Sequence, residues 1–432
     1  MRHAAGVPLA YRLGARIAAP LYCGVLAWRG FTERGYWRNF GERLGLGAPL
    51  APHGVWVHCA SVGEVQAAAQ LLRTLRARLA GPMLLTTVTP AGAARARALF
   101  AGQALEVRHL PLDLPGPVRR FLDRIRPRLA LILETELWPR LYAECAERGI
   151  ALVLANARIS ERSARRYALL RGAFAGALER CALIAAQSEA DGARLAALGA
   201  APARTHVTGN LKFDLAPPRE SLARASALTA EVLGARSLWV GGSTHEGEEI
   251  ALLEAHAKAR TASADLLLAL APRHPQRFEA VARLLASRGV AFVRRSRAER
   301  CESATQVLLI DTLGELTDFY AAADVVFVGG SLVRAGGHNL IEPAALGRAI
   351  LTGPHHENAR DVLERLTAAG AVRIVADAAE LGAQLAALLA DPLARARMGQ
   401  AGLGVVEHNR GALERLLQLL APYLSPVLKA AE

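Results

Sequence analysis

From residue 55 onward, short apolar runs alternate with longer stretches in which apolar and polar residues mix at helical spacing. This alternation is typical of a parallel β-sheet covered by helices, because each buried strand is followed by a helix that returns the chain to the same end of the sheet. Six such runs in the first half predict one doubly wound sheet: residues 55–59, 83–88, 105–110, 129–133, 151–155 and 183–186.

The alternation pauses between residues 209 and 234. Pro217 and Pro218 would break a helix there, and residues 210–214 have the composition of a loop, so we expect a linker between two domains. The pattern then resumes, and a helical tail is expected over residues 392–424. The apolar runs of the second half predict another sheet: residues 238–240, 266–270, 291–293, 307–310, 325–328, 349–351 and 372–375.

Two sheets of this kind predict an α/β fold with two Rossmann-like domains facing a central cleft, where a small-molecule site is expected. The expected parts are an amino-terminal membrane-associated segment, a first Rossmann-like domain, a linker, a second Rossmann-like domain and a carboxy-terminal helix. Their predicted bounds are 1–48, 49–212, 213–234, 235–410 and 411–432.

The amino-terminal segment contains an apolar run, residues 17–28, flanked by Arg16 and Arg29. The run is shorter than the ~20 residues that a spanning helix needs. A signal peptide would place small residues at a cleavage site after the run, whereas Trp28 and Phe31 occupy that region. We therefore expect a basic helix with interfacial aromatic residues lying on a membrane surface. The alternative is a buried first helix of a soluble domain.

Composition narrows the possible partners. Lys and Arg outnumber Asp and Glu by 52 to 39, a formal net charge of +13, which suits an anionic substrate or an acidic membrane surface but can also reflect solvated helix faces rich in Arg. No basic tract interleaved with aromatic residues and no nucleic-acid motif is present, which disfavours nucleic acid as a partner. The five cysteines are far apart and form no CxxC pair, which disfavours a disulfide framework or a zinc knuckle.

The loop after the first predicted strand contains Ser61-Val62-Gly63-Glu64. Glu64 would project from the first turn of a helix at the strand edge where ligands bind, and a carboxylate there can accept a proton from a substrate hydroxyl. The alternative is structural, because S-x-x-E is also the pattern of a helix capping box. A position at a helix amino terminus is expected to keep the pKa of Glu64 near or below its ordinary value.

Glycine-rich loops mark the second half. Gly329-Gly330-Ser331 follows one predicted strand, and residues 336–343 open a helix with Gly-Gly-His-Asn and Glu-Pro. Backbone amides of such loops can approach an anion closely, so we expect a nucleotide phosphate near them. Glu342 would lie at the start of the helix, where a carboxylate can accept hydrogen bonds from both hydroxyls of a ribose.

Two further strand ends contribute to the same expected pocket. Arg273 and His274 follow residues 266–270, and a guanidinium suits a phosphate because its donors form a fork. Gly241-Gly242-Ser243-Thr244-His245 follows residues 238–240 and offers amides and hydroxyls. Either loop alone could be a surface turn.

Together these motifs resemble those of the Kdo transferases, which transfer 3-deoxy-D-manno-octulosonic acid (Kdo). The resemblance runs from about Trp28 to about Asn409. It rests on these segments in this order: Ser61 to Glu64, Glu134 to Pro139, Asn156 to Arg158, Gly209 to Lys212, Gly242 to His245, Pro272 to His274, and Gly336 to Pro343.

The resemblance implies a GT-B fold and an inverting glycosyltransferase that moves Kdo from CMP-Kdo to a lipid A precursor, lipid IVA, in lipopolysaccharide biosynthesis. It also implies attachment to the cytoplasmic face of the inner membrane. The first Rossmann-like domain would hold the acceptor and the second would bind CMP-Kdo. Arg12 and Arg16 depart from the family pattern, because they interrupt what is usually a more continuous apolar helix.

The resemblance also assigns residue roles. Glu64 matches the catalytic base, and Glu134 and Glu136 are expected to shape the acceptor side. The expected donor-binding residues are Arg273, Ser243, Thr244, Gly336, Gly337, Asn339, Glu342 and Lys212.

No bound metal or tightly bound cofactor is expected. No D-x-D pair lies in a convincing strand-end loop, and His355-His356 lacks a Cys or acidic partner at fixed spacing. Two alternatives share the fold: a GT-B enzyme that uses another nucleotide sugar such as a UDP-sugar, and a lipid-binding scaffold without catalytic activity.

Overall fold

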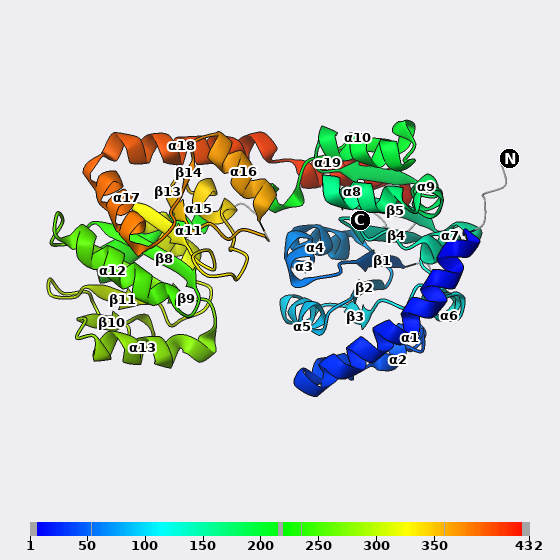
Figure 1. The fold of residues 1–432 in the computed structure, drawn as a ribbon, viewed down its shortest axis with the longest axis horizontal. Coiled ribbons are helices and arrows are strands. Elements are labelled where there is room, and N and C mark those ends of the chain that lie inside the picture. Colours follow the sequence, from blue (N-terminus) through cyan, green and yellow to red (C-terminus); the bar gives the residue numbers. More distant parts are fainter. Residues whose placement is uncertain (1–6, 53, 215–218, 235, 358, 426–432) are drawn as a thin grey trace. The chain divides into compact units, whose positions relative to one another are not determined.

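The computed structural model describes residues 7–52, 54–214, 219–234, 236–357 and 359–425. The chain divides into two compact units, one formed by Met1–Asp214 with Arg410–Glu432 and the other by Leu215–Asn409 (Figure 1). Each unit is built around one parallel sheet, and the predicted α/β class is confirmed.

The first unit contains a seven-stranded sheet in the order β3-β2-β1-β4-β5-β6-β7. All of its pairs are parallel, and the chain reverses its direction of winding between β1 and β4. Six of the strands match the predicted runs. The short β7 was not predicted, because its side chains are mostly exposed and produce no apolar run. The strands are β1 (Val55–His58), β2 (Met83–Thr87), β3 (Leu105–His109), β4 (Leu129–Leu133), β5 (Ala151–Ala157), β6 (Leu183–Ala186) and β7 (Thr205–Val207).

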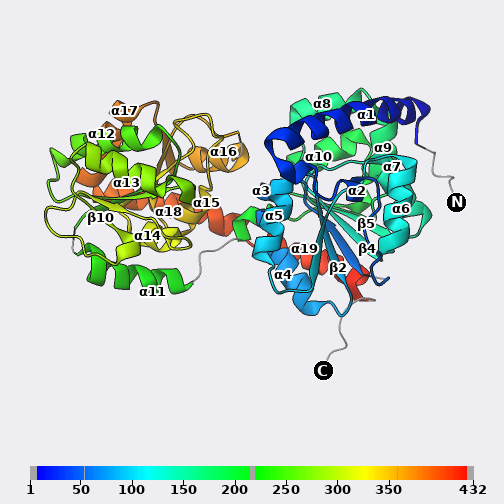
Figure 2. The ribbon, with the colours of Figure 1, turned by 90° about the horizontal axis from the view of Figure 1, so that it is seen from below.

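Helices cover both faces of this sheet (Figure 2), which explains why its strands are continuously apolar. Side chains alternate along a strand, so Val55 and Val57 belong to one core and Trp56 to the other. The helices are α3 (Val62–Ala67), α4 (Ala69–Arg78), α5 (Pro90–Leu99), α6 (Pro115–Ile125), α7 (Pro139–Glu147), α8 (Glu161–Ala168), α9 (Arg171–Glu179), α10 (Glu189–Leu198) and α19 (Ala412–Leu424).

The second unit has a seven-stranded parallel sheet in the order β10-β11-β9-β8-β12-β13-β14, which reverses between β8 and β12. Its strands are β8 (Leu238–Thr244), β9 (Leu267–Pro272), β10 (Phe292–Arg294), β11 (Val307–Leu309), β12 (Val325–Val328), β13 (Ala349–Thr352) and β14 (Val372–Ile374). Its helices are α11 (Arg219–Leu228), α12 (Glu248–Arg260), α13 (Phe278–Ser287), α14 (Leu316–Ala322), α15 (Ile341–Ala345), α16 (Arg360–Ala368), α17 (Ala378–Ala390) and α18 (Pro392–Asn409).

The segment expected to be a linker is largely helical. Residues 211–214 form a short 3-10 helix, and residues 219–233 form α11 and a π-helical turn, with α11 against α14 of the second unit. Pro217 and Pro218, on which the prediction partly rested, lie outside the described residues.

The helical tail consists of two helices, α18 and α19. Gly411 has a φ of 86° and separates α18 from α19. The carboxylate of Asp214 accepts hydrogen bonds from the amides of Gly411 and Leu413, both at 2.6 Å, and so satisfies the amino terminus of α19. Leu416 and Leu420 then enter the core of the first unit.

The first helix, α1 (Leu9–Thr32), is longer than the predicted apolar run and packs along the first unit (Figure 2). On its inner side, Tyr11 donates a 2.7 Å hydrogen bond to Asp113 and Leu26 is buried. On its outer side, a row of large apolar side chains is exposed. The alternative of a fully buried first helix is therefore wrong. The row consists of Leu9, Leu13, Ile17, Leu21, Val25, Trp28 and Phe31. Within the described residues, no helix combines the length and apolar character needed to cross a membrane.

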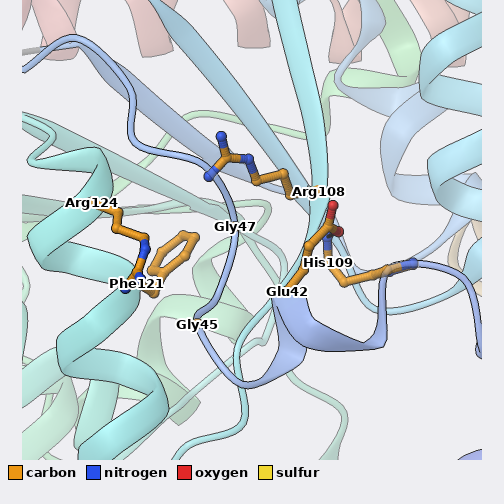
Figure 3. Close-up of a pocket in the computed structure, with 7 residues that line it drawn as sticks. All are labelled: Glu42, Gly45, Gly47, Arg108, His109, Phe121 and Arg124. Atoms are coloured by element: carbon orange, nitrogen blue, oxygen red, sulfur yellow. Dashed lines mark hydrogen bonds between the residues drawn. The ribbon is translucent and has the colours of Figure 1, made fainter.

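A second contact fastens the amino-terminal segment to the sheet. Figure 3 shows the loop through Gly45 and Gly47 between strand β3 and the helix that carries Phe121 and Arg124. Just before this loop, Glu42 accepts a 2.8 Å hydrogen bond from the amide of His109. The amino-terminal segment is therefore an integral layer of the first unit.

Candidate functional site

Glu64 lies in the first turn of α3, which follows β1 at the reversal point of the first sheet, where open α/β sheets bind ligands. Its carboxylate accepts hydrogen bonds from the amide of Ala60 at 2.7 Å and from the hydroxyl of Ser61 at 3.1 Å, and Ser61 in turn accepts from the amide of Glu64. The N-cap bond of the capping box considered as the structural alternative is therefore present, whereas the return bond from the carboxylate goes to Ala60 rather than to the amide of Ser61. These bonds hold the carboxylate in a defined position at the strand edge.

The structure contradicts the expectation of an ordinary or lowered pKa for this side chain. Burial, and then the negative charges of Glu134 and Glu136, raise the pKa of Glu64 to about 8, although the hydrogen bonds from Ala60 and Ser61 oppose this shift. The contribution of the helix amino terminus is thus outweighed by desolvation and by two neighbouring carboxylates. Perturbed carboxyl groups of this kind are frequent in active sites.

The two neighbouring carboxylates come from the loop after β4, so Glu64, Glu134 and Glu136 share one sheet edge. Glu134 has a left-handed backbone, with φ at 55°. Glu136 is fixed by a 3.0 Å hydrogen bond from the indole of Trp138 and lies 3.6 Å from the buried ring of His58. His58 was missed by the sequence analysis, because nothing in an apolar strand distinguishes it from a core residue.

Cations also face this edge. The Nζ of Lys212 lies 4.0 Å from Oε1 of Glu134, and the Nε of Arg158 lies 3.9 Å from its Oε2. Lys212, which the resemblance assigned to the donor, therefore belongs to the same unit and the same sheet edge as Glu64.

Asn156 explains why two of the recognised motifs occur together. It occupies an irregularity in β5 with φ at 51°, and its side-chain oxygen accepts a 3.0 Å hydrogen bond from the amide of Leu211. Asn210 then accepts a 3.0 Å hydrogen bond from the amide of Lys212. The Asn-Ala-Arg and Gly-Asn-Leu-Lys segments thus support each other and place Arg158 and Lys212 beside Glu134.

In the second unit, the loop Gly329 to Leu332 differs from the prediction. The carboxylate of Glu248, which is fully buried at the start of α12, accepts hydrogen bonds from the amides of Gly330, Ser331 and Leu332 at 2.7 to 2.9 Å. It also accepts from the amide of His245 at 2.8 Å. These loop amides were expected to face a phosphate, and that expectation is wrong because an internal carboxylate already occupies them.

The end of β8 is held by a second carboxylate. The Thr244 hydroxyl donates a 2.7 Å hydrogen bond to Glu249, which also accepts hydrogen bonds from Arg277 at 2.6 and 2.9 Å. The buried Thr244 side chain therefore supports the loop from within. Ser243 is partly exposed and has a left-handed backbone, with φ at 57°.

The predicted Gly336 to Glu342 segment begins with two glycines in the left-handed region, with φ at 90° and 72°. A Cβ on Gly337 would lie 2.5 Å from a ring nitrogen of His356, so this position requires glycine. At the other end, Asn339 donates a 2.9 Å hydrogen bond to Glu342. Burial raises the pKa of Glu342, whereas the bond from Asn339 and the charge of Arg273 lower it.

Arg273 and three histidines gather beside this segment. The amide of Arg273 donates to Thr244 at 2.9 Å, and its side chain is exposed. The Nε2 atoms of His245 and His338 are 2.9 Å apart, and the ring of His274 stands edge-on to His245 with centroids 5.3 Å apart. Burial and then the charge of Arg273 lower the pKa of His338 to about 4.

The pair His355-His356 does not act together. His356 is buried, and its Nε2 lies 2.7 Å from the carbonyl oxygen of Gly353 and 3.1 Å from the hydroxyl of Thr352. Within the described ranges, no group of three or more His, Cys, Asp or Glu side chains has an arrangement suited to a metal ion.

Residues 38–215 match the family model described as 3-deoxy-D-manno-octulosonic-acid transferase (kdotransferase). The 3-deoxy-D-manno-octulosonic acid transferase of Bordetella pertussis is 40% identical over 433 residues, which is 96% of this chain and 99% of that protein. The enzyme of the same description from Haemophilus influenzae is 40% identical over 90% of this chain and 92% of its own length.

Solved structures agree on the fold. The UDP-GlcNAc 2-epimerase of Neisseria meningitidis superposes with a TM-score of 0.55 at 13% identity, over 85% of this chain and all of that one. At this identity the likeness concerns the GT-B-like arrangement of two parallel-sheet domains and not the reaction. The family model and the two relatives that align along nearly their whole length establish that this chain belongs to the 3-deoxy-D-manno-octulosonic acid (Kdo) transferases, a family of glycosyltransferases.

Proposed function

We propose that this chain transfers Kdo with inversion from CMP-Kdo to a lipid A precursor, lipid IVA, and that Glu64 is the catalytic base. The observation that carries the proposal is the carboxyl group of Glu64, which is partly buried at the reversal point of the first sheet and has a pKa of about 8. A carboxylate with a raised pKa is a stronger base than an ordinary one, which suits removal of a proton from a sugar hydroxyl.

The bond changes follow from the substrates. The acceptor hydroxyl oxygen forms a bond to the anomeric carbon of Kdo, its proton goes to Glu64, and the bond from that carbon to the phosphate oxygen of CMP breaks. Positive charge develops on the sugar ring and negative charge on the departing phosphate. Groups that stabilise a departing phosphate are therefore required, and no bound metal or other cofactor is part of the proposal.

The second unit would hold the donor. Arg273 presents an exposed guanidinium for the phosphate, and Glu342 presents a carboxylate, oriented by Asn339, for the ribose hydroxyls. Gly336 and Gly337 let the loop approach the nucleotide closely. Ser243 would contact the donor directly, and Thr244 would act through the loop that it supports.

The first unit would hold the acceptor. Glu134 and Glu136 would shape the acceptor side and keep the pKa of Glu64 raised, as their charges do in the free protein. Lys212 and Arg158 would balance these carboxylates and attract the anionic acceptor. The resemblance assigned Lys212 to donor binding, whereas its position beside Glu134 favours a contact with the acceptor.

We further propose that α1 attaches the protein to the cytoplasmic face of the inner membrane. The exposed apolar row on its outer side, with Trp28 and Phe31 at one end, suits the interface of a bilayer. The exposed Arg12 and Arg16 lie on the same helix and would contact anionic head groups.

The test is incubation of the purified protein with CMP-Kdo and a tetraacylated lipid A precursor, followed by mass spectrometry of the lipid. The proposal predicts a product heavier than the acceptor by one or more Kdo residues. A parallel reaction with UDP-GlcNAc as donor should leave the acceptor mass unchanged. Transfer from the UDP-sugar, with none from CMP-Kdo, would contradict the donor assignment.

A further inference from the structure

Two imidazole rings in the second unit are close enough to share a proton. His245 follows β8 and His338 lies in the loop before α15, and their Nε2 atoms are 2.9 Å apart. The rings are nearly parallel, with an interplanar angle of 14°. At this distance one ring must donate an Nε2 proton to the lone pair of the other.

The backbone holds both rings where they are. The amide of His245 is fixed by Glu248, and the amide of Gly337, just before His338, donates a 2.7 Å hydrogen bond to the carbonyl of Gly330. A Cβ on Gly330 would come within 2.8 Å of the ring of His338. The close approach of the rings is therefore built into the glycine loops.

The glycine loop itself is not free to bind an anion. Glu248 occupies the amides of Gly330, Ser331 and Leu332. These three amides are therefore not available to a phosphate, and side chains nearby must contribute to holding one. The exposed guanidinium of Arg273 is one such group, and its charge lowers the pKa of His338.

The acidic groups around the pair are already engaged. Glu248 is bound to amides, Glu249 is paired with Arg277, and Glu342 accepts from Asn339. Glu246 is exposed. The remaining neighbours are cationic or titratable: Arg273 and His274 after β9, and His355 and His356 after β13. An anion bound here would meet the guanidinium of Arg273 and these imidazole rings.

We propose that His245 and His338 form a proton-accepting pair that binds the phosphate of the nucleotide and takes up one proton as that phosphate becomes dianionic. The inference rests on the proposed function, because the anion is the phosphate of CMP. In the neutral pair, one ring has Nε2 protonated and Nδ1 free to accept a proton. Protonation of that Nδ1 keeps the shared Nε2 hydrogen bond and leaves one positive charge on the pair.

The charge change of the reaction matches this uptake. The phosphate of CMP-Kdo is a diester with one negative charge, and released CMP is a monoester with up to two. Without an anion, burial and then the charge of Arg273 lower the pKa of His338 to about 4, so this ring is neutral. A dianion nearby favours the protonated form. The pair would therefore stabilise the leaving group more than the intact donor, which is the condition for lowering the barrier.

The test is calorimetric titration of the full-length protein with CMP at pH 7.5, in two buffers with different ionisation enthalpies. The difference in apparent binding enthalpy reports the protons taken up. We expect uptake by the parent protein on binding CMP and none on binding cytidine, which lacks the phosphate.

Two variants locate the proton. His245→Gln and His338→Gln can still form hydrogen bonds but cannot accept a proton, so each should lose the uptake and bind CMP roughly ten- to a hundredfold more weakly. Cytidine affinity should stay within about twofold of that of the parent in both variants. This result would show that the nucleoside site is intact. His408→Gln, on the exposed surface of α18, is the matched control and should behave as the parent.

The outcomes separate this inference from the proposed function. Two results would overturn the proton-accepting pair and leave the donor site intact. The first is a CMP binding enthalpy that does not depend on the buffer, and the second is proton uptake that persists in both pair variants. Failure of CMP to bind the parent at all would overturn the donor site and the pair with it.

Discussion

At the scale of single residues, carboxylates with different surroundings have different tasks. Glu64 is partly buried near two other carboxylates and has a raised pKa, so it is mostly protonated at neutral pH and can exchange a proton. Glu248 is fully buried and accepts four amide hydrogen bonds, which hold two loops in place. The surroundings of Glu64 suit proton transfer, and those of Glu248 suit a structural role.

The raised pKa of Glu64 predicts a pH-dependent contribution to stability. The folded pKa of about 8 lies above that of an ordinary glutamate, so the folded state binds this proton more tightly than the unfolded chain. The contribution is therefore present at pH 4 to 5 and is lost as the pH rises toward about 8. Glu64→Gln cannot lose a proton, so its melting temperature should exceed that of the parent by more at pH 8.5 than at pH 5.5. A difference that does not change with pH would contradict the raised pKa.

Glu342 supports a prediction on nucleotide recognition. If its carboxylate accepts from both ribose hydroxyls, the parent should bind CMP about tenfold or more tightly than 2′-deoxy-CMP, since one hydrogen bond to a charged group is lost. Glu342→Gln should bind the two nucleotides nearly equally, as measured by titration. Strong discrimination by the variant would exclude the ribose contact.

At the scale of elements, parallel strands gather groups that are far apart in the sequence. The loop after β8 and the loop after β12 are joined by Glu248, which bonds to residues 82 to 84 positions later in the chain. Sequence spacing contains no sign of this bond. The position of the loops at strand ends could be predicted from the apolar runs, whereas the use of their amides depended on a side chain from another element.

Removal of Glu248 should loosen both loops. Glu248→Ala leaves buried amides without a partner, and we expect a loss of about 3 kcal/mol or more in the stability of the second unit. CMP affinity should fall with it, because His245 and the glycine loop lose their common support. Thermal unfolding and CMP titration would measure the two effects. Glu254→Ala, at an exposed position of the same helix, is the control and should change neither.

The first helix supports a prediction on membrane binding. Leu21→Asp places a charge in the exposed apolar row of α1 and should reduce sedimentation with vesicles of phosphatidylethanolamine and phosphatidylglycerol about tenfold or more, because a charged side chain is costly in the interface. Leu313→Asp changes an equally exposed leucine of the second unit and should leave vesicle binding unaltered. Equal binding by both variants and the parent would remove α1 as the attachment surface.

At the scale of the whole molecule, the two-sheet organisation followed from the alternation of apolar runs. Both sheets are parallel and reverse their winding, as doubly wound sheets do. The β7 strand escaped prediction because Thr205 to Val207 is mostly exposed. The return of α19 to the first unit also escaped prediction, because it depends on Asp214 and Gly411, which are distant in sequence.

The candidate site was predictable to a similar degree. The position of Glu64, Glu134 and Glu136 at strand ends could be predicted from the apolar runs that precede them. The electrostatics of the site could not be predicted, because the pKa of Glu64 is set by burial and by Glu134 and Glu136 rather than by its own helix. Lys212 likewise could be found as part of a motif, but only the folded chain places it beside Glu134.

The most direct test of the account compares single-turnover transfer of Kdo by the parent and by Glu64→Gln between pH 6 and 9. The ionised form of Glu64 is the base, so the rate of the parent should rise with pH and level off above about pH 8. The variant should be slower by roughly a hundredfold to ten-thousandfold and lack this rise, with CMP affinity within about twofold of the parent. A variant rate within tenfold of the parent, with the same pH profile, would remove Glu64 from the mechanism.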